Sequence, residues 1–158
     1  MTRRAITPIE VLLSIAVVVS ATAALAPLHT QDDPAKRTVC LKNVKLVCTA
    51  IAIYEADYDD HVPLAKKWMD LVKPYTKNEA FYHCTEVGTK AYGYALSSAA
   101  AGKNVEKIAN PATEVLLFDS TVLTRSAVST LKSLPKPGRH EGKNNIGYID
   151  THAKSVAR

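Results

Sequence analysis

Residues 3–28 read RRAITPIEVLLSIAVVVSATAALAPL, and this stretch decides how the rest of the chain is interpreted. Eighteen uncharged residues, 11–28, follow Glu10. Residues 6–28 supply a mostly apolar run, and a helix that crosses a bilayer needs about 20 such residues. Arg3 and Arg4 precede the run, and the positive-inside rule places them in the cytoplasm. The sequence therefore predicts a membrane-spanning helix over residues 6–28.

Glu10 is a carboxylate inside this apolar run. Its burial in a membrane costs roughly 2.5–3.5 kcal/mol, so such a residue is usually functional and needs a partner. The segment resembles a pilin-type processing signal, which implies a cut between Ala5 and Ile6. Such a cut would create an α-amino group four residues before Glu10, on the same helix face. That ammonium group, from the same or a neighbouring subunit, would neutralise Glu10 and set the register of helices packed in a fibre.

The pattern resembles the N-terminal signal of type IV pilins and type II secretion pseudopilins. In that family a prepilin peptidase removes a short basic leader, and the fifth residue of the mature chain is glutamate, here Glu10. The family usually has glycine before the cut and phenylalanine after it, where this chain has Ala5 and Ile6. The resemblance implies a leader over residues 1–5, a transmembrane and filament-core helix over 6–28, and a helix continuation with a globular head over 29–158.

An ordinary secretory signal peptide is the alternative interpretation. Arg3 and Arg4 would form its charged region, residues 11–19 its apolar region, and residues 21–23 its small-residue cleavage site. Pro8 and Glu10 interrupt the early part of such a signal. This alternative predicts a secreted or periplasmic soluble binding domain.

The C-terminal part carries a second resemblance. Nine residues separate His140 from Asp150, and His152 follows two residues later. This spacing is similar to that of the H-x9-DG class of pilin-like proteins, which has glycine where this chain has Thr151. A tight hairpin turn there often needs a positive φ, which a β-branched residue resists.

Hydrophobic periodicity predicts the elements between these two motifs. They are a helix over residues 35–58 preceded by a break around Pro34, a short helix over 67–75, extended pieces at 81–84 and 92–96, a buried strand over 114–119, and a hairpin of 146–149 with 152–156. Residues 120–133 are ambiguous. Together with the resemblance, this predicts an α+β, pilin-like fold. A long N-terminal helix, transmembrane in its first half, would pack its second half on a small antiparallel sheet.

The three cysteines are Cys40, Cys48 and Cys84. Export would permit one disulfide and leave one thiol. Cys40 and Cys48 lie eight residues apart on one predicted helix, about 12 Å at 1.5 Å per residue, which is too far for a bridge. Cys84 therefore belongs to any intrachain pair, and Cys40–Cys84 is the favoured one. Three buried thiols are the alternative, and the absence of a Cys-x-x-Cys or close Cys/His spacing argues against zinc.

Charge and motifs exclude several function classes. The net charge is +5 at pH 7, and the scattered lysines form no array with aromatic residues, so no nucleic-acid partner is predicted. His140, Asp150 and His152 have no accompanying nucleophile motif, so the protein is not expected to be an enzyme.

An acidic turn is the one weak cofactor candidate. Asp57, Asp59 and Asp60 offer oxygen ligands to calcium, but the spacing of an EF-hand is absent. The expectation is therefore no cofactor, with calcium as the alternative at these three residues.

The expected function is structural: a pilin-like subunit of a type II secretion or type IV pilus-like system. The resemblance implies a single-pass protein of the bacterial inner membrane with its C-terminal head outside the cytoplasm. Its partners would be other pilin-like subunits, the prepilin peptidase, the inner-membrane assembly machinery and membrane lipid.

Overall fold

A computed structural model describes residues 33–88 and 90–157, with side chains from residue 38 onward. The predicted leader, the cleavage site at Ala5 and Ile6, the predicted partner residue Glu10 and the apolar segment 6–28 lie outside the described residues.

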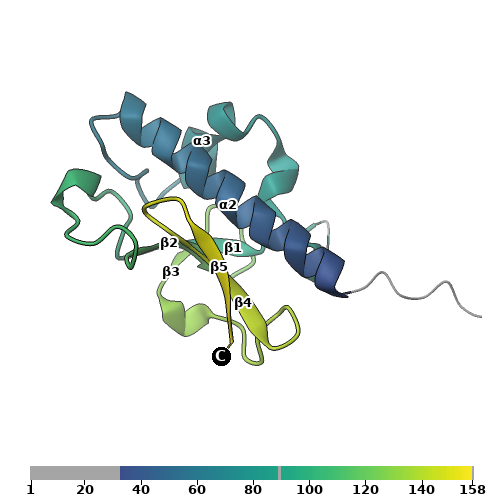
Figure 1. The fold of residues 1–158 in the computed structure, drawn as a ribbon. Coiled ribbons are helices and arrows are strands. Elements are labelled where there is room, and N and C mark those ends of the chain that lie inside the picture. The colour runs from purple at the N-terminus through teal and green to yellow at the C-terminus, as the bar shows by residue number, and fades with distance from the viewer. Residues whose placement is uncertain (1–32, 89, 158) are drawn as a thin grey trace, which may run out of the picture. The chain divides into compact units, whose positions relative to one another are not determined.

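Two α-helices and five strands form the described part of the chain (Figure 1). The helices are α2 (Asp33–Asp57) and α3 (Trp68–Thr76). The strands are β1 (Tyr94–Ser97), β2 (Val115–Asp119), β3 (Val128–Ser129), β4 (Lys143–Tyr148) and β5 (Ala153–Ala157). Four short 3₁₀ turns connect them: η1 (Glu79–Tyr82), η2 (Thr85–Val87), η3 (Val105–Lys107) and η4 (Leu131–Ser133).

The strands make one sheet in the order β3-β1-β2-β4-β5. Neighbouring strands pair antiparallel except β1 and β3, which run parallel. The sheet is therefore mixed, because the chain returns after β2 to the outer edge of β1.

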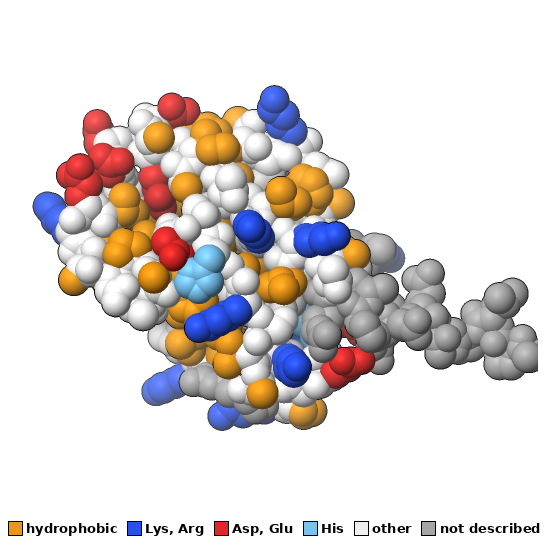
Figure 2. All heavy atoms as spheres, viewed as in Figure 1, with side chains coloured by type: hydrophobic (Ala, Val, Ile, Leu, Met, Phe, Trp, Pro, Cys, Tyr) orange, Lys and Arg blue, Asp and Glu red, His pale blue; other side chains and the backbone are white. Residues whose placement is uncertain are grey.

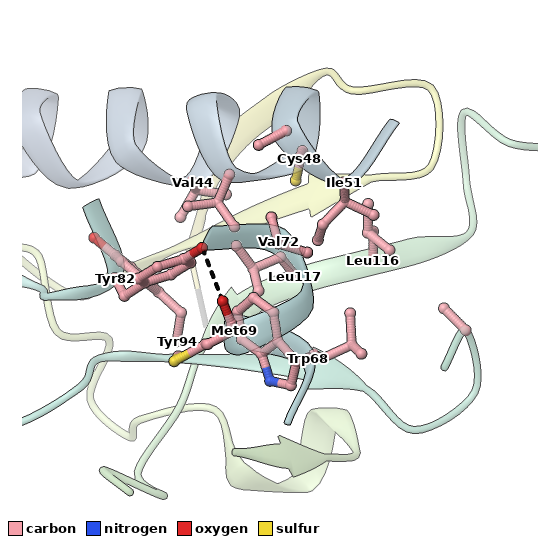
Figure 3. Close-up of a cluster of buried hydrophobic side chains, with 14 of the residues drawn as sticks. Val44, Cys48, Ile51, Trp68, Met69, Val72, Tyr82, Tyr94, Leu116 and Leu117 are labelled. Atoms are coloured by element: carbon pink, nitrogen blue, oxygen red, sulfur yellow. Dashed lines mark hydrogen bonds between the residues drawn. The ribbon is translucent and has the colours of Figure 1, made fainter. Parts of the chain in front are cut away.

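Helix α2 packs on one face of this sheet through residues at helical spacing. Its fully buried side chains are Cys40, Val44, Val47, Cys48 and Ile51. Figure 3 shows Val44, Cys48 and Ile51 above α3 and the sheet residues Leu116 and Leu117. The contact is close because β4 carries Gly147 here: an added Cβ would lie 2.4 Å from Cys48 Sγ. A glycine in the strand thus lets the helix backbone approach the sheet.

Trp68, at the start of α3, is the largest fully buried side chain of this core. Its Nε1–H donates to the carbonyl of Ala127 at 3.0 Å, and its ring meets Tyr82 edge to face at 5.7 Å between centroids. The polar end of the indole is thereby satisfied while the ring is buried in hydrocarbon. The opposite sheet face has its own smaller core, made by Ala95, Phe118, Ala127, Leu134, Ile146 and Tyr148.

The C-terminal hairpin is confirmed. Strands β4 and β5 pair antiparallel across the turn at Asp150 and Thr151. Thr151 adopts a φ of 70°, the left-handed conformation expected for this position, and its N–H donates to Tyr148 O at 2.9 Å. Asp150 Oδ1 accepts the N–H of His152 at 3.2 Å. These turn hydrogen bonds hold a β-branched residue in a conformation that it otherwise resists.

The predicted pilin-like fold class is wrong. The sheet has five strands and is mixed, not small and antiparallel, because the ambiguous residues 120–133 add β3 parallel to β1. Helices α2 and α3 cover 25 and 9 residues, and in the part of the chain that the structure describes no helix is long and apolar enough to cross a membrane.

A smaller local prediction is also wrong. Residues 81–84 were expected to be extended, but residues 79–82 form the 3₁₀ turn η1. The side chain of Asn78 accepts the N–H of Ala80 at 2.9 Å and so caps this turn, a device that favours helical over extended backbone.

Candidate functional site

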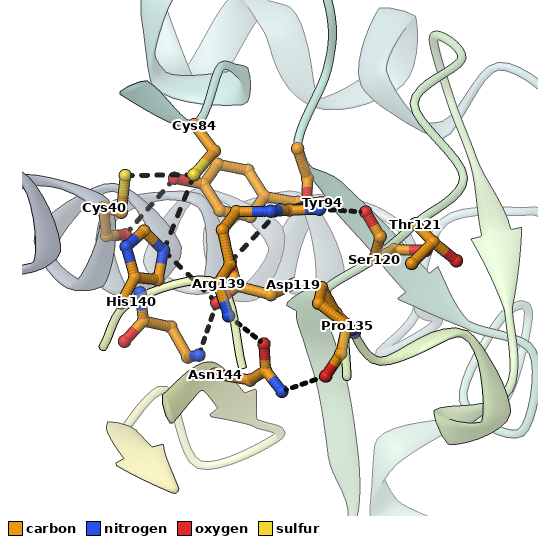
Figure 4. A network of polar contacts seen from close by, with 12 residues as sticks. Cys40, Cys84, Tyr94, Asp119, Ser120, Thr121, Pro135, Arg139, His140 and Asn144 are labelled. Carbon is orange, nitrogen blue, oxygen red and sulfur yellow. Dashed lines mark hydrogen bonds and ion pairs between the residues drawn. The ribbon is translucent and has the colours of Figure 1, made fainter. Parts of the chain in front are cut away.

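Cys40, Cys84 and His140 meet in one buried cluster, although each comes from a different segment (Figure 4). Cys40 lies on α2, Cys84 lies between η1 and η2, and His140 lies in the loop before β4. Both cysteines are fully buried and His140 is 2% exposed. The two Sγ atoms are 3.3 Å apart, and Cys84 Sγ is 3.5 Å from His140 Nε2.

Two glycines position the cluster. A Cβ at Gly93 would lie 2.2 Å from the Cβ of Cys84, so glycine alone permits this approach of the segment before β1. A Cβ at Gly138 would lie 2.5 Å from the backbone of Gly142 and Lys143, which closes the tight loop that carries His140. The His140 N–H donates to Lys143 O at 2.9 Å and holds this loop on the end of β4.

Asp119, the last residue of β2, connects the cluster to the sheet. Its Oδ2 atom lies 3.4 Å from His140 Nε2 and accepts the backbone N–H of Asn145 at 2.6 Å. Arg139 Nη1 lies 3.8 Å from Asp119 Oδ1 and donates to Gly93 O at 2.8 Å. Asp119 is fully buried, so an ion pair this deep requires such partners.

The two clustered cysteines differ in their electrostatics. The hydrogen bond with Cys84, together with contacts to His140 and Thr85, outweighs burial and lowers the pKa of the Cys40 thiol. The Thr85 N–H, which donates to Cys40 Sγ at 3.3 Å, favours the thiolate on this sulfur. The hydrogen bond with Cys40 and burial raise the pKa of Cys84. The polar contacts thus favour a thiolate on Cys40 over a thiolate on Cys84.

His140 carries the compensating charge. Burial lowers its pKa, but the contacts with Asp119 and Cys40 outweigh burial and raise the pKa of His140 to about 9. Three buried atoms around it, His140 Nδ1, Asp119 Oδ1 and Asn145 Nδ2, have no hydrogen-bond partner. A buried polar atom without a partner costs about 1–3 kcal/mol, so several in one place are a sign of function.

The predicted disulfide pair is brought together. Cys40 and Cys84 are free thiols in this structure, with sulfur atoms at hydrogen-bond distance, so the Cys40–Cys84 disulfide stays a prediction. Cys48 lies apart from them, beneath Gly147, where burial raises the pKa of its thiol.

The residues of the predicted family motif divide between two places. His140 lies in the buried cluster, whereas Asp150 and His152 pair with each other at the exposed hairpin turn, where the imidazole stacks on Tyr148 at 4.3 Å. The sequence spacing of His140 and Asp150 thus corresponds to the length of one strand and its turn.

The weak calcium candidates lie at the end of α2. Asp57 accepts a hydrogen bond from Tyr75 Oη at 2.8 Å, while Asp59 and Asp60 take left-handed conformations with φ of 51° and 57°. Among residues 38–88 and 90–157, the one group of three metal-ligand side chains with donor atoms within 4.8 Å of one another is Cys40, Cys84 and His140. The three aspartates do not form such a group.

Sequence reasoning missed how these residues combine. The prediction against a zinc site relied on ligands that lie close together in the sequence. Here 44 residues separate the two cysteines and 56 separate Cys84 from His140. Two features of the sequence could have indicated the buried cluster: Asp119 at the end of the most apolar strand, and Arg139 beside His140.

Comparisons with known proteins find no counterpart: no protein-family model, no curated protein and no solved structure matches this chain.

Proposed function

We propose that this protein is a membrane-anchored structural subunit that assembles in a pilin-like manner outside the cytoplasm. Residues 6–28 would anchor it after a prepilin peptidase has cut behind Ala5, and Glu10 would pair with the amino terminus of a neighbouring subunit. This proposal concerns assembly and does not require the pilin-like fold. The observation that carries it for the described residues is an apolar stripe on α2.

The apolar stripe consists of Val39, Leu46 and Ile53, which are 45%, 46% and 50% exposed. They recur every seven residues and so lie on one side of α2, along about 21 Å of helix at 1.5 Å per residue. The opposite side of the same helix is buried on the sheet. A helix with apolar residues on both sides is expected to have a second partner.

Charge is distributed unevenly along the stripe. Lys42 and Lys45 are exposed on its N-terminal half, and Asp57 and Asp59 are exposed where α2 ends. Figure 2 shows acidic side chains gathered at the upper left, where α2 ends in Figure 1, and basic side chains scattered over this face. The complementary surface for such a stripe is the same stripe on a second copy, shifted along its length.

A shifted contact between identical stripes is heterologous, since each copy uses its basic half toward one neighbour and its acidic end toward the other. Contacts of this kind do not close and produce open helical filaments. The partner that we propose for α2 is therefore another copy of this chain, with related pilin-like subunits, the assembly machinery and membrane lipid as its surroundings.

The test uses the full-length chain in its native membrane and combines intact mass with a filament assay. We expect a chain that starts at Ile6. We also expect V39S/L46S/I53S to stop assembly while the head stays folded, because the three side chains are already exposed. Leu64→Ser is the matched control, since Leu64 is 68% exposed but lies outside α2.

Two variants address the N-terminal segment. Glu10→Val is expected to block assembly and Ala5→Glu to block processing, both with a folded head. Normal filaments from both variants would refute the proposal. A mature chain that starts near Ala24 would instead support the secreted binding domain, and normal filaments from the triple variant would exclude the stripe on α2 as the contact.

A further inference from the structure

We propose that Cys40, Cys84 and His140 form a binding site for one divalent, thiophilic metal ion, with zinc as the best-fitting ion. The proposal does not depend on how the protein assembles, and it excludes the predicted Cys40–Cys84 disulfide, because both sulfurs bind the ion as thiolates. Two thiolates and one imidazole are a ligand set that zinc prefers in proteins.

The distances between the donor atoms agree with a four-coordinate centre. With usual zinc–sulfur and zinc–nitrogen bond lengths, tetrahedral geometry separates a sulfur from a nitrogen ligand by about 3.5 Å. Cys84 Sγ and His140 Nε2 are 3.5 Å apart. Two sulfur ligands lie about 3.8 Å apart in the same geometry, and the observed separation between Cys40 and Cys84 is 3.3 Å. All three donor atoms lie within 4.8 Å of one another, which is close enough for one ion to bind them together.

Asp119 lies beside these three ligands but outside the group. Its Oδ2 atom is 3.4 Å from His140 Nε2, yet among residues 38–88 and 90–157 the side chains whose donor atoms all lie within 4.8 Å of one another are Cys40, Cys84 and His140. The chain therefore supplies three ligands, and water takes the fourth position of a tetrahedral zinc ion.

Formal charge selects a divalent ion. In the bound state two thiolates and the Asp119 carboxylate carry three negative charges, and Arg139, 3.8 Å from Asp119, carries one positive charge. A divalent cation makes this buried group neutral, whereas a monovalent ion such as cuprous copper leaves one net negative charge. An uncompensated buried charge is costly, so the surroundings favour zinc.

A groove borders the cluster. It has a volume of about 520 Å³ and is lined by residues that include Asn43, Phe81, Cys84 and Thr85. Cys84 thus connects the cluster to this groove, although its side chain is fully buried.

The test titrates cobalt(II) into the reduced full-length chain in detergent, with a phosphine as the reductant. We expect one equivalent per chain and an absorption band of sulfur-to-cobalt charge transfer, which zinc displaces. Cys40→Ser, Cys84→Ser and His140→Gln are each expected to lose this band. Cys48→Ser is the matched control and is expected to keep it, because Cys48 is equally buried on the same helix but lies outside the cluster.

A second measurement protects the test against variants that fail to fold. Zinc is expected to raise the Tm of the unaltered chain and of Cys48→Ser, since a ligand that binds only the folded state stabilises it. Protein isolated without oxygen is expected to contain about one zinc per chain. A Cys40–Cys84 disulfide in that protein, copper in place of zinc, or a charge-transfer band that survives loss of Cys40 and Cys84 would each overturn the proposal.

Discussion

Cys40 and Cys48 lie eight residues apart on α2, both fully buried, yet their surroundings differ in every other respect. Around Cys48 the helix packs on Gly147 of β4, and burial raises the pKa of its thiol. Around Cys40 it meets a second thiol, an imidazole and the N–H of Thr85, and the pKa falls. Burial is common to both sites, so the polar partners, and not burial, decide the chemistry of each cysteine.

The same difference applies to the regions around them. The apolar region, from Val44 to Ile51 with α3, is stabilised by burial of hydrocarbon. The polar region, with Cys40, Asp119, Arg139 and His140, buries charges that must be paired. Both regions are expected to contribute to stability, the first through burial of hydrocarbon and the second through paired charges, and the variants below measure how much buried apolar and buried charged side chains each contribute.

The largest expected effect is in the apolar region. Trp68→Ala removes a fully buried ring and its hydrogen bond to Ala127, and it should lower the free energy of unfolding by about 4 kcal/mol. Denaturant titration of the full-length chain measures this loss. Leu64→Ala, at a 68% exposed position, is expected to change little. Equal losses from the two variants would contradict the core described above.

The next effect is in the polar region. Asp119→Asn keeps the shape of the side chain but removes the charge that pairs with Arg139 and His140. Breaking a buried pair from one side leaves an uncompensated charge, so we expect a loss of about 3 kcal/mol by denaturant titration. Asp70→Asn is the matched control, because the ion pair of Asp70 with Arg125 is partly exposed and is worth at most about 1 kcal/mol. A smaller loss from Asp119→Asn than from Asp70→Asn would show that the cluster is not a paired, buried site.

The smallest effect depends on pH and concerns Glu55, near the end of α2. Burial, with the charge of Asp60, raises the pKa of Glu55 to about 7. Because the pKa of Glu55 is higher in the folded state than in the unfolded state, the folded state favours the protonated side chain. The stability that Glu55 contributes is therefore complete below pH 4.5 and is lost as pH rises through 7 and the side chain ionises. Glu55→Gln should therefore match the unaltered chain at pH 4 and be more stable by about 1–2 kcal/mol at pH 8.

Thermal unfolding at the two pH values measures this difference. Glu106→Gln, at an exposed glutamate, is the control. The same stability difference at pH 4 and pH 8 would mean that Glu55 is not held in an apolar environment.

Local patterns in the sequence predicted most single elements. The helix over 35–58, the short helix at 67–75, the strand over 114–119 and the C-terminal hairpin are all confirmed, with bounds shifted by a few residues. Each has a strong local signal, either apolar spacing or a turn between two strands. The 3₁₀ turn at residues 79–82 was missed because it depends on one capping side chain, Asn78.

Assembly of these elements was not predictable in the same way. β3 has only two residues and pairs in parallel with β1, so no periodic pattern marks it and the sheet was wrongly expected to be antiparallel. The cluster of Cys40, Cys84 and His140 likewise has no sequence motif, because its members are 44 and 56 residues apart.

The sequence alone determined the positions of the helices and long strands, the turn at Asp150 and Thr151, and the presence of an apolar stretch before residue 29. These properties depend on neighbours within a few residues, where side-chain period and backbone preference act. Tertiary structure alone decided the mixed strand order. It also decided that Cys48 is surrounded by apolar side chains and that Cys40 lies in the cluster with His140. Both depend on close packing of distant segments, which here requires glycine at positions 93, 138 and 147.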